Sequence, residues 1–211
     1  MNPILAFDYA GIAVFAATGA LAASRKQLDI IGFLFLAGVT GVGGGTFRDL
    51  ILGLTPVFWI RDPGHILVCA SVAILVYFTA HLFESRWKLI LWLDAVGLSA
   101  YCVLGAQIGL DVTGSPAVAI VTGVLTATFG GILRDLLANE PSVLLRPEIY
   151  VTAALAGAAM HTGLMLAGLP LLASALIAAA AAFIVRGGAL KFGWAFPRYR
   201  ARPGRRPEDI P

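Results

Sequence analysis

The chain has 211 residues, of which 59% are hydrophobic and only 13% are charged, and its formal net charge is +3. Soluble globular proteins are about 45–50% apolar and about 25% charged, so this composition excludes a soluble domain. The mean hydropathy of +0.86 indicates a membrane protein.

Apolar blocks of about 20 residues recur along the chain, which is the length that a helix needs to cross about 30 Å of hydrocarbon. In chain order, the blocks cover residues 4–23, 30–53, 64–83, 88–108, 116–138, 148–168 and 170–187. We therefore predict an all-α membrane protein with seven transmembrane helices. Asp8 lies inside the first block, so we expect this helix to be retained and not cleaved as a signal.

Basic residues predict the orientation of these helices, because cytoplasmic loops are enriched in lysine and arginine. The breaks after the first, third and fifth blocks carry basic residues, whereas those after the fourth and sixth carry none. We therefore expect the N-terminus outside and the C-terminus in the cytoplasm. The basic residues assigned to the cytoplasmic side are Arg25, Lys26, Arg86, Lys88, Arg146, Arg186, Lys191, Arg198, Arg200, Arg202, Arg205 and Arg206.

The polybasic tail also raises the possibility of nucleic-acid binding. A basic segment directly inside a membrane is more often a topology anchor that attracts anionic lipid. We therefore expect membrane lipid as a partner and no nucleic acid. Cys69, Cys102 and the three histidines lack the spacing of a metal site, so we expect no metal and no cofactor. The chain also lacks a nucleophile–base pair and a phosphate loop, so we do not expect an enzyme.

The chain repeats itself with an offset of 86 residues. The segment GVGGGTFRDLI contains Arg48 and Asp49, and the later segment TATFGGILRDLL contains Arg134 and Asp135. The same offset aligns, without a gap, Asp8 with Asp94, Gly11 with Gly97, Gly19 with Gly105, Thr40 with Thr126, Gly44 with Gly130 and Gly45 with Gly131.

This repeat predicts an inverted architecture. A unit of three helices ends on the opposite side of the membrane, so the second copy enters with opposite orientation. We expect a first three-helix repeat over residues 1–87, an inverted second repeat over 88–169, a seventh helix over 170–190 and a basic cytoplasmic tail over 191–211. The two arginine–aspartate pairs then flank the membrane midplane from opposite sides.

Glycines lie near the middle of the second and fifth predicted helices, at Gly43, Gly44, Gly45, Gly130 and Gly131. Each lowers helix propensity by about 1 kcal/mol relative to alanine. Backbone groups freed in hydrocarbon must face protein or water. We therefore predict that both helices are kinked at these glycines and line an aqueous path. The alternative is close helix packing, for which small residues at G-x-x-x-G spacing are typical.

The charged residues of the repeat are costly in a membrane. Each arginine or aspartate at mid-span costs about 2.5–3.5 kcal/mol on insertion scales, so these side chains must face one another or water. Adjacent residues point about 100° apart on a helix. We therefore hypothesise that Arg48 pairs with Asp135 and that Arg134 pairs with Asp49, across the two repeats. The alternative is a purely structural role in holding the repeats together.

Two G-G-x-x-R-D elements, Gly44–Asp49 and Gly130–Asp135, stand within a three-plus-three-plus-one helix pattern. This combination resembles the prokaryotic branch of the trimeric intracellular cation (TRIC) channels, which includes glycine-transporter-like and uncharacterised bacterial membrane proteins. The resemblance implies a homotrimer in the inner membrane with one pore per protomer, bounded by the second and fifth helices. It implies conduction of monovalent cations, chiefly potassium, along a pathway that contains Gly43–Gly45, Arg48, Asp49, Gly130, Gly131, Arg134 and Asp135.

A second function stays open. Some bacterial relatives of this kind are assigned to glycine uptake, and a secondary transporter for glycine or another small zwitterionic amino acid could use arginine for the carboxylate and aspartate for the ammonium. Animal members carry a lysine-rich second motif linked to phosphoinositide lipid. The chain has Arg134 and Asp135 without that pattern, so we do not carry this lipid regulation over.

Overall fold

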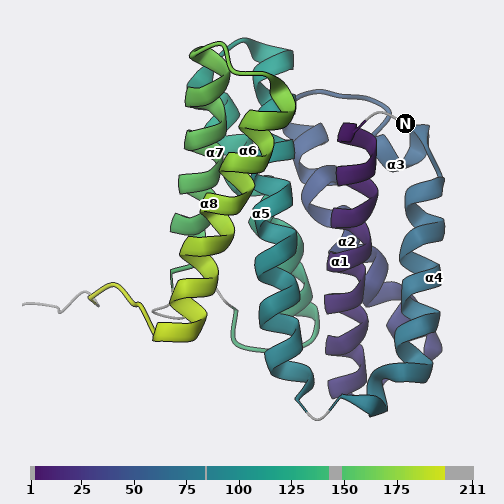
Figure 1. The fold of residues 1–211 in the computed structure, drawn as a ribbon. Coiled ribbons are helices and arrows are strands. Elements are labelled where there is room, and N and C mark those ends of the chain that lie inside the picture. Colours follow the sequence, from purple (N-terminus) through teal and green to yellow (C-terminus); the bar gives the residue numbers. More distant parts are fainter. Residues whose placement is uncertain (1–2, 84, 143–148, 198–211) are drawn as a thin grey trace, which may run out of the picture.

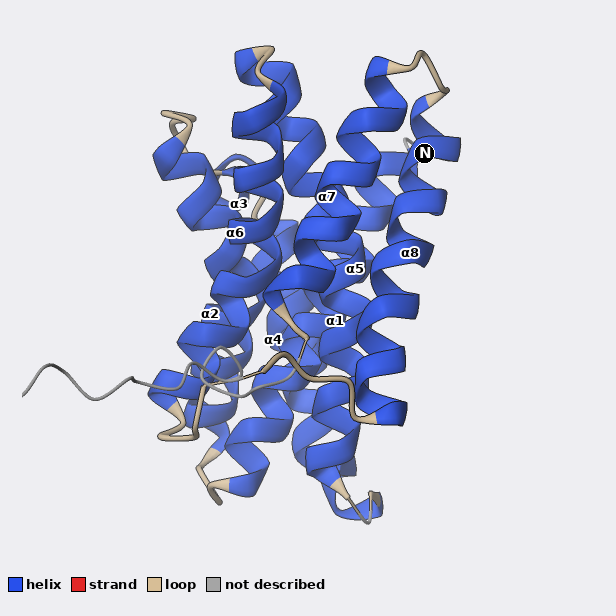
Figure 2. Ribbon diagram, turned by 90° about the vertical axis from the view of Figure 1, so that its left-hand side faces the viewer, coloured by secondary structure: helices blue, strands red, loops and turns tan. Residues whose placement is uncertain are grey.

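The computed structural model describes residues 3–83, 85–142 and 149–197, and helices build the fold over these ranges. Figure 2 shows them packed side by side in one bundle. The elements are α1 (Pro3–Arg25), α2 (Ile30–Ile51), α3 (Phe58–Arg61), α4 (Gly64–Thr79), the 3-10 turn η1 (Ala80–Leu82), α5 (Arg86–Thr113), α6 (Pro116–Leu137), α7 (Val151–Leu166) and α8 (Leu171–Phe192).

The long helices alternate in direction along the chain (Figure 1). The start of α1 and the end of α8 lie at opposite ends of the bundle. We name the end that holds the start of α1 the outer end, and the end that holds the last turn of α8 the inner end, after the orientation expected from the basic residues. The basic tail from residue 198 onward and Arg146 lie outside the described residues.

Six of the helices are long and apolar enough to cross a membrane, which confirms the all-helical membrane fold. These spans are Phe7–Arg25, Ile30–Ile51, Gly64–Leu82, Arg86–Thr113, Pro116–Leu137 and Leu171–Phe192. The apolar helix α7 has only 16 residues, which is about 24 Å of helix at about 1.5 Å per residue. The count of seven transmembrane helices therefore stays a prediction.

Helix ends depend on capping groups and not on the first charged residue after an apolar block. The side chain of Ser85 accepts a hydrogen bond from the backbone N–H of Lys88, and α5 ends at Gly114 with φ 63°. Helix α8 likewise continues to Gly193 with φ 69°, a backbone conformation that favours glycine. Arg186, which we grouped with the cytoplasmic basic residues, therefore lies inside α8, where it is completely buried. Arg186 is thus a helix residue and not part of the basic tail, and the side of the membrane on which it lies stays a prediction.

Helices α1 and α5 lie at the centre of the bundle. In the most apolar 18 residues of each helix, 61% of α1 and 67% of α5 are buried, against 28% of both α4 and α8. Their crossing is reciprocal, because a Cβ added at Gly11 would lie 3.1 Å from the Tyr101 ring and one added at Gly97 would lie 3.0 Å from the Phe15 ring. Tyr101 and Gly97 are the counterparts of Phe15 and Gly11 at the offset of 86 residues.

Helices α2 and α6 cross at their glycines in the same reciprocal way. A Cβ added at Gly44 would collide with the carbonyl oxygen of Thr126, and one added at Gly130 would lie 2.5 Å from the carbonyl oxygen of Thr40. Both segments remain α-helical through these glycines. The glycines thus permit a close backbone contact, as the packing alternative expects. The kinks in α2 and α6 stay a prediction.

Candidate functional site

The outer charged pair forms within α2. Arg48 donates from Nε and Nη2 to Oδ1 of Asp49, at 2.8 and 2.6 Å. The other carboxylate oxygen, Oδ2, accepts a hydrogen bond of 2.8 Å from the backbone N–H of Phe58 and lies 3.6 Å from Nη2 of Arg61. Arg48 is 4% exposed and Asp49 is fully buried. The short helix α3 therefore holds the outer pair in place.

The inner charged pair lies in α6 and has more partners. Arg134 donates from Nε and Nη2 to Oδ1 of Asp135, at 2.9 and 2.8 Å. Its Nη1 donates to Oδ1 of Asp94 at 2.8 Å and to the hydroxyl of Thr18 at 3.0 Å. All four side chains are buried. This one guanidinium therefore joins α6 to α5 within the second repeat and to α1 of the first.

The hypothesis of cross-repeat pairs between Arg48 and Asp135 and between Arg134 and Asp49 is wrong. Each arginine binds the aspartate that follows it in the chain. The 100° angle between adjacent Cβ directions separates short side chains, but an arginine is long enough for its guanidinium to fold back along the helix. The crossing of α2 and α6 at Gly44 and Gly130 also places the two pairs at opposite ends of the bundle, because the two helices are antiparallel.

A cavity of about 380 Å³, the outer cavity, opens beside the outer pair. It brings together residues from α1, α2, α3, α4 and α5, and its wall contains both ions of the Arg48–Asp49 pair. Its lining residues are Asp8, Arg48, Asp49, Leu54, Phe58, Arg61, Asp62, His65 and Ile108. Arg61 is 51% exposed, so the cavity offers one accessible guanidinium near three carboxylates.

Asp62 stays ionised at the mouth of this cavity. It lies between the spans of α2 and α4, and the hydroxyl of Tyr9 donates to its Oδ2 at 2.6 Å. The backbone N–H of Gly64 donates to its Oδ1 at 3.0 Å. These two hydrogen bonds, with that from Tyr9 the stronger influence, lower the pKa of the Asp62 carboxyl. The outer cavity therefore keeps a carboxylate at its solvent side.

Tyr150 lies beside the inner pair, and Arg186 lies over the Tyr150 ring. Tyr150 is 2% exposed, and a Cβ added at Gly131 would lie 2.9 Å from its hydroxyl. The guanidinium of Arg186 lies 5.0 Å from the centre of the Tyr150 ring, and its Nη1 donates to the carbonyl of Ile149 at 3.1 Å. Arg186 comes from α8, the helix without a counterpart in the repeat. The same sequence motif thus borders a cavity at the outer end and lies against Tyr150 at the inner end.

The remaining predicted glycines also lie at helix contacts. A Cβ added at Gly43 would lie 3.0 Å from Leu133, and one added at Gly45 would lie 2.6 Å from the ring of Phe58. Next to this region, the rings of Phe47 and Phe129 stack with their centroids 3.9 Å apart and their planes at 6°. Any movement of α2 against α6 has to change this stack.

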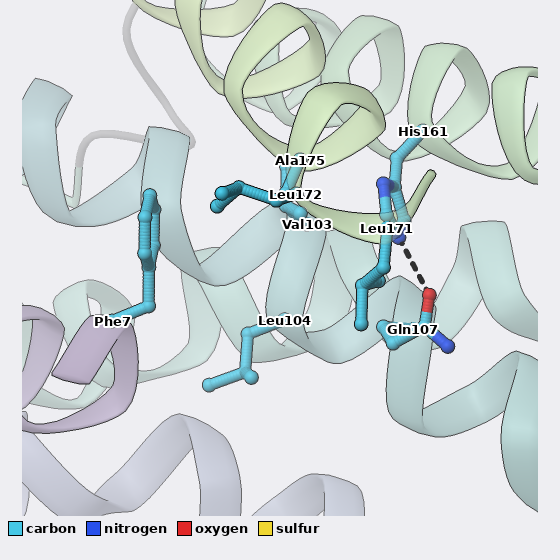
Figure 3. A pocket seen from close by; sticks show the side chains of 8 residues that line it. All are labelled: Phe7, Val103, Leu104, Gln107, His161, Leu171, Leu172 and Ala175. Atoms are coloured by element: carbon cyan, nitrogen blue, oxygen red, sulfur yellow. Dashed lines mark hydrogen bonds between the residues drawn. The ribbon is translucent and has the colours of Figure 1, made fainter. Parts of the chain in front are cut away.

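A second cavity, of about 180 Å³, lies between α1, α5, α7 and α8 (Figure 3). Its lining residues are Phe7, Val103, Leu104, Gln107, His161, Leu171, Leu172 and Ala175. Nε2 of His161 lies 2.9 Å from Oε1 of Gln107, and its Nδ1 lies 2.8 Å from the hydroxyl of Ser174. These hydrogen bonds join α5, α7 and α8, so the polar residues have a structural role beside an apolar cavity.

The sequence analysis missed several residues that complete the two sites. They are His65 and Tyr9 at the outer cavity, and Thr18 and Tyr150 at the inner pair, and none of them belongs to the repeated motif. One available signal was Arg186, a lone charge within an otherwise apolar segment. Within the described ranges, no group of three or more His, Cys, Asp or Glu residues could hold a metal ion.

The chain is similar to a family of bacterial membrane proteins over most of its length. A family model described as glycine transporter matches residues 5–81 and 91–167, once in each repeat. A UPF0126 membrane protein of Vibrio cholerae is 37% identical over 196 residues, covering 91% of this chain and 81% of that protein. The UPF0126 inner membrane protein YadS of Escherichia coli K12 is 36% identical over 197 residues, covering 91% and 94%.

Solved structures extend this match to the fold. The TRIC trimeric intracellular cation channel orthologue from Rhodobacter sphaeroides has a TM-score of 0.90 and 50% identity, covering 92% of this chain and 100% of that chain. A prokaryotic TRIC channel in 0.5 M KCl has a TM-score of 0.84 and 28% identity, covering 90% and 96%. These relatives are channels or transporter-like membrane proteins, so the chain is not an enzyme. With the family model matched in both repeats and the fold shared over nine-tenths of its length, the chain belongs to the glycine transporter family and, within it, to the prokaryotic TRIC channels.

Proposed function

We propose that the protein conducts monovalent cations, with potassium among them, through each protomer of a homotrimer in the inner membrane. The observation that carries this proposal is the outer cavity, where the buried Arg48–Asp49 pair meets two further carboxylates. The solved TRIC relative that is 50% identical is named a cation channel. The proposed pathway runs past Gly43–Gly45, Arg48 and Asp49 of α2 and past Gly130, Gly131, Arg134 and Asp135 of α6.

The charges of the outer cavity suit weak attraction of cations. Asp8, Asp49 and Asp62 supply three carboxylates, and Arg48 and Arg61 supply two guanidiniums. Oδ1 of Asp49 is already bound twice by Arg48, and its Oδ2 is bound by a backbone N–H. An arginine close to the path lowers the affinity for a cation, and conduction requires that a bound ion can leave.

The described conformation corresponds to a closed channel in this proposal. The outer pair lines a cavity, whereas Tyr150 lies beside the inner pair and Arg186 lies over the Tyr150 ring. Opening requires a rearrangement at the inner end, and we propose that α2 and α6 bend at their glycines to produce it. The outer end faces the outside of the cell in the orientation that the basic residues predict.

Electrical recording tests this function directly. The purified full chain in a planar bilayer with a KCl gradient should give single-channel currents that reverse near the potassium equilibrium potential. Vesicles from the same preparation should take up no labelled glycine above protein-free vesicles. Saturable glycine uptake with counterflow, and no unitary current, would contradict the proposal. Crosslinking in the membrane should stop at three subunits.

A secondary transporter for glycine or a similar zwitterion is the second candidate. The outer cavity favours it, because alternating access requires a site that can open to one side of the membrane. The half-exposed Arg61 could bind a carboxylate, and the nearby Asp8 could bind an ammonium group. The family model is also described as glycine transporter. The uptake and counterflow measurements separate this candidate from the channel.

A further inference from the structure

His65 lies in the wall of the outer cavity. The hydrogen bonds of its imidazole ring indicate which ring nitrogen carries a hydrogen. Its Nδ1 lies 2.8 Å from the backbone carbonyl oxygen of Asp62. A carbonyl oxygen can only accept a hydrogen bond, so Nδ1 carries a hydrogen. In a neutral imidazole with this tautomer, Nε2 holds a lone pair and can only accept.

The other ring nitrogen faces a second acceptor. Nε2 of His65 lies 3.1 Å from Oδ2 of Asp8. A lone pair on Nε2 and an ionised carboxylate would repel each other at this distance. The contact therefore requires one proton between them, either on Nε2 of an imidazolium ring or on a neutral Asp8 carboxyl that donates to the ring.

We propose that His65 and Asp8 form a proton-binding site in the wall of the outer cavity and that its proton controls how strongly the cavity attracts cations. This inference rests on the proposed conduction of cations. The pair takes up and releases one proton as a unit, and it does so on the outer side of the membrane alone.

The surroundings hold the pair in a fixed geometry. The Tyr9 ring stacks on the His65 ring with centroids 4.5 Å apart and planes at 11°, and the Phe58 ring meets it edge-on at 5.0 Å. The Tyr101 hydroxyl donates to Oδ1 of Asp8 at 3.3 Å. The titratable and charged groups that surround the pair are Tyr9 of α1, Arg48 and Asp49 of α2, Arg61 of α3, Asp62 of the α3–α4 connection, Cys69 of α4 and Tyr101 of α5.

The proton decides the net charge of the cavity. Three carboxylates are balanced by two guanidiniums and the proton of the His65–Asp8 pair. When pH rises and this proton leaves, one negative charge remains uncompensated. Cations are then attracted, and we expect potassium conductance to rise about two- to fivefold at low salt and less at high salt.

At the repeat-matched positions of the described residues, the inner pair has no equivalent proton site. At the offset of 86 residues, His65 aligns with Val151 and Asp8 aligns with Asp94. Asp94 accepts its hydrogen bond from Arg134, which stays charged at every accessible pH. A change of pH on the inner side should therefore leave this charge balance unaltered.

The experiment records potassium currents of the full chain in a planar bilayer while pH is changed from about 5 to about 9 on one face at a time, a range that covers histidine titration. We expect conductance to rise with pH on the outer face only. His65→Gln and Asp8→Asn each remove one member of the pair and should abolish this rise. His81→Gln, at an exposed histidine of η1, is the matched control and should retain it.

Each failure has its own signature. Wild-type currents that do not depend on outer pH, or a pH-dependent rise that persists in His65→Gln, would overturn the proton site and leave the channel proposal intact. Absence of any current would reject conduction, and ring ¹⁵N chemical shifts of labelled histidine then test the site alone. A His65 ring whose protonation stays constant across this range, or titrates identically in Asp8→Asn, overturns the inference.

Discussion

The two arginine–aspartate pairs share a sequence motif but lie in different environments. The Arg48–Asp49 pair borders an open cavity, and α3 supplies a backbone N–H to its carboxylate. The Arg134–Asp135 pair lies beside Tyr150, and the guanidinium of Arg186 from α8 lies over that ring. Arg186 belongs to α8, which follows the two segments that the family model matches. The two copies of the motif thus supply two matched charged pairs, both of them buried, whose surroundings differ.

The largest expected effect is at the inner pair. Arg134→Ala leaves Asp94 and Asp135 as buried carboxylates without their guanidinium, and breaking such a buried pair costs about 3–5 kcal/mol. The variant should show strongly reduced thermal stability in detergent. Arg48→Ala should lose less thermal stability, because Arg48 lies beside the outer cavity. Equal losses in the two variants would contradict the difference in environment.

The glycine crossing should behave symmetrically, because its contacts are reciprocal. Gly44→Ala and Gly130→Ala each push a methyl group into a backbone carbonyl of the facing helix, and overpacking of this kind costs about 1–3 kcal/mol. Gly163→Ala in α7 is the control, since nothing lies within 4 Å of an added Cβ. Thermal unfolding of the three variants checks this. If Gly163→Ala lowers the thermal stability as much as Gly44→Ala and Gly130→Ala do, the close contact of α2 and α6 at these glycines is not important for stability.

The next prediction concerns Arg186, which lies over the Tyr150 ring beside the inner pair. Arg186→Gln keeps an N–H donor for the Ile149 carbonyl but removes the charge over the Tyr150 ring. We expect the open probability in bilayer recordings to increase by about tenfold, equivalent to about 1.4 kcal/mol. Lys191→Gln, in the exposed last turn of the same helix, should leave it unchanged. A folded Arg186→Gln protein with wild-type open probability would show that Arg186 is not part of a gate.

The smallest effect is expected at the cavity mouth. Arg61 is half-exposed and lies 3.6 Å from Asp49, and ion pairs in such positions contribute about 0–1 kcal/mol. Arg61→Gln should therefore leave thermal stability nearly unchanged. It removes a positive charge, so potassium conductance at low salt should rise modestly, by about two- to fivefold. A conductance that falls instead would argue that this guanidinium binds a substrate, as the transporter alternative requires.

Much of the fold was predictable from residue pattern. The apolar blocks located the long helices, because hydrocarbon selects length and hydrophobicity. The helix ends were harder, since α5 and α8 continue through polar residues until Gly114 and Gly193 provide a left-handed cap. The four-residue helix α3 left no periodic signal, although its first N–H positions Asp49.

The pairing of the charges was not predictable in the same way. A charged side chain is costly in hydrocarbon, so the sequence shows that four residues need partners: Arg48, Asp49, Arg134 and Asp135. The same cost does not show which residues those partners are. Side-chain length and the rotamer that the packing selects decided in favour of the adjacent aspartate. Likewise, nothing in the local sequence of His65 indicated that α1 would bring Asp8 against its ring.

The amino-acid order by itself determined a duplicated, helical membrane protein with costly charges beside glycines, because the energy of transfer into hydrocarbon acts on each segment separately. Which end of the bundle opens, and which groups share a proton or a hydrogen bond, was decided by the tertiary structure alone. These properties depend on contacts between residues that are far apart in the chain, such as Thr18 and Arg134. Such residues can form hydrogen bonds only after whole helices have packed together.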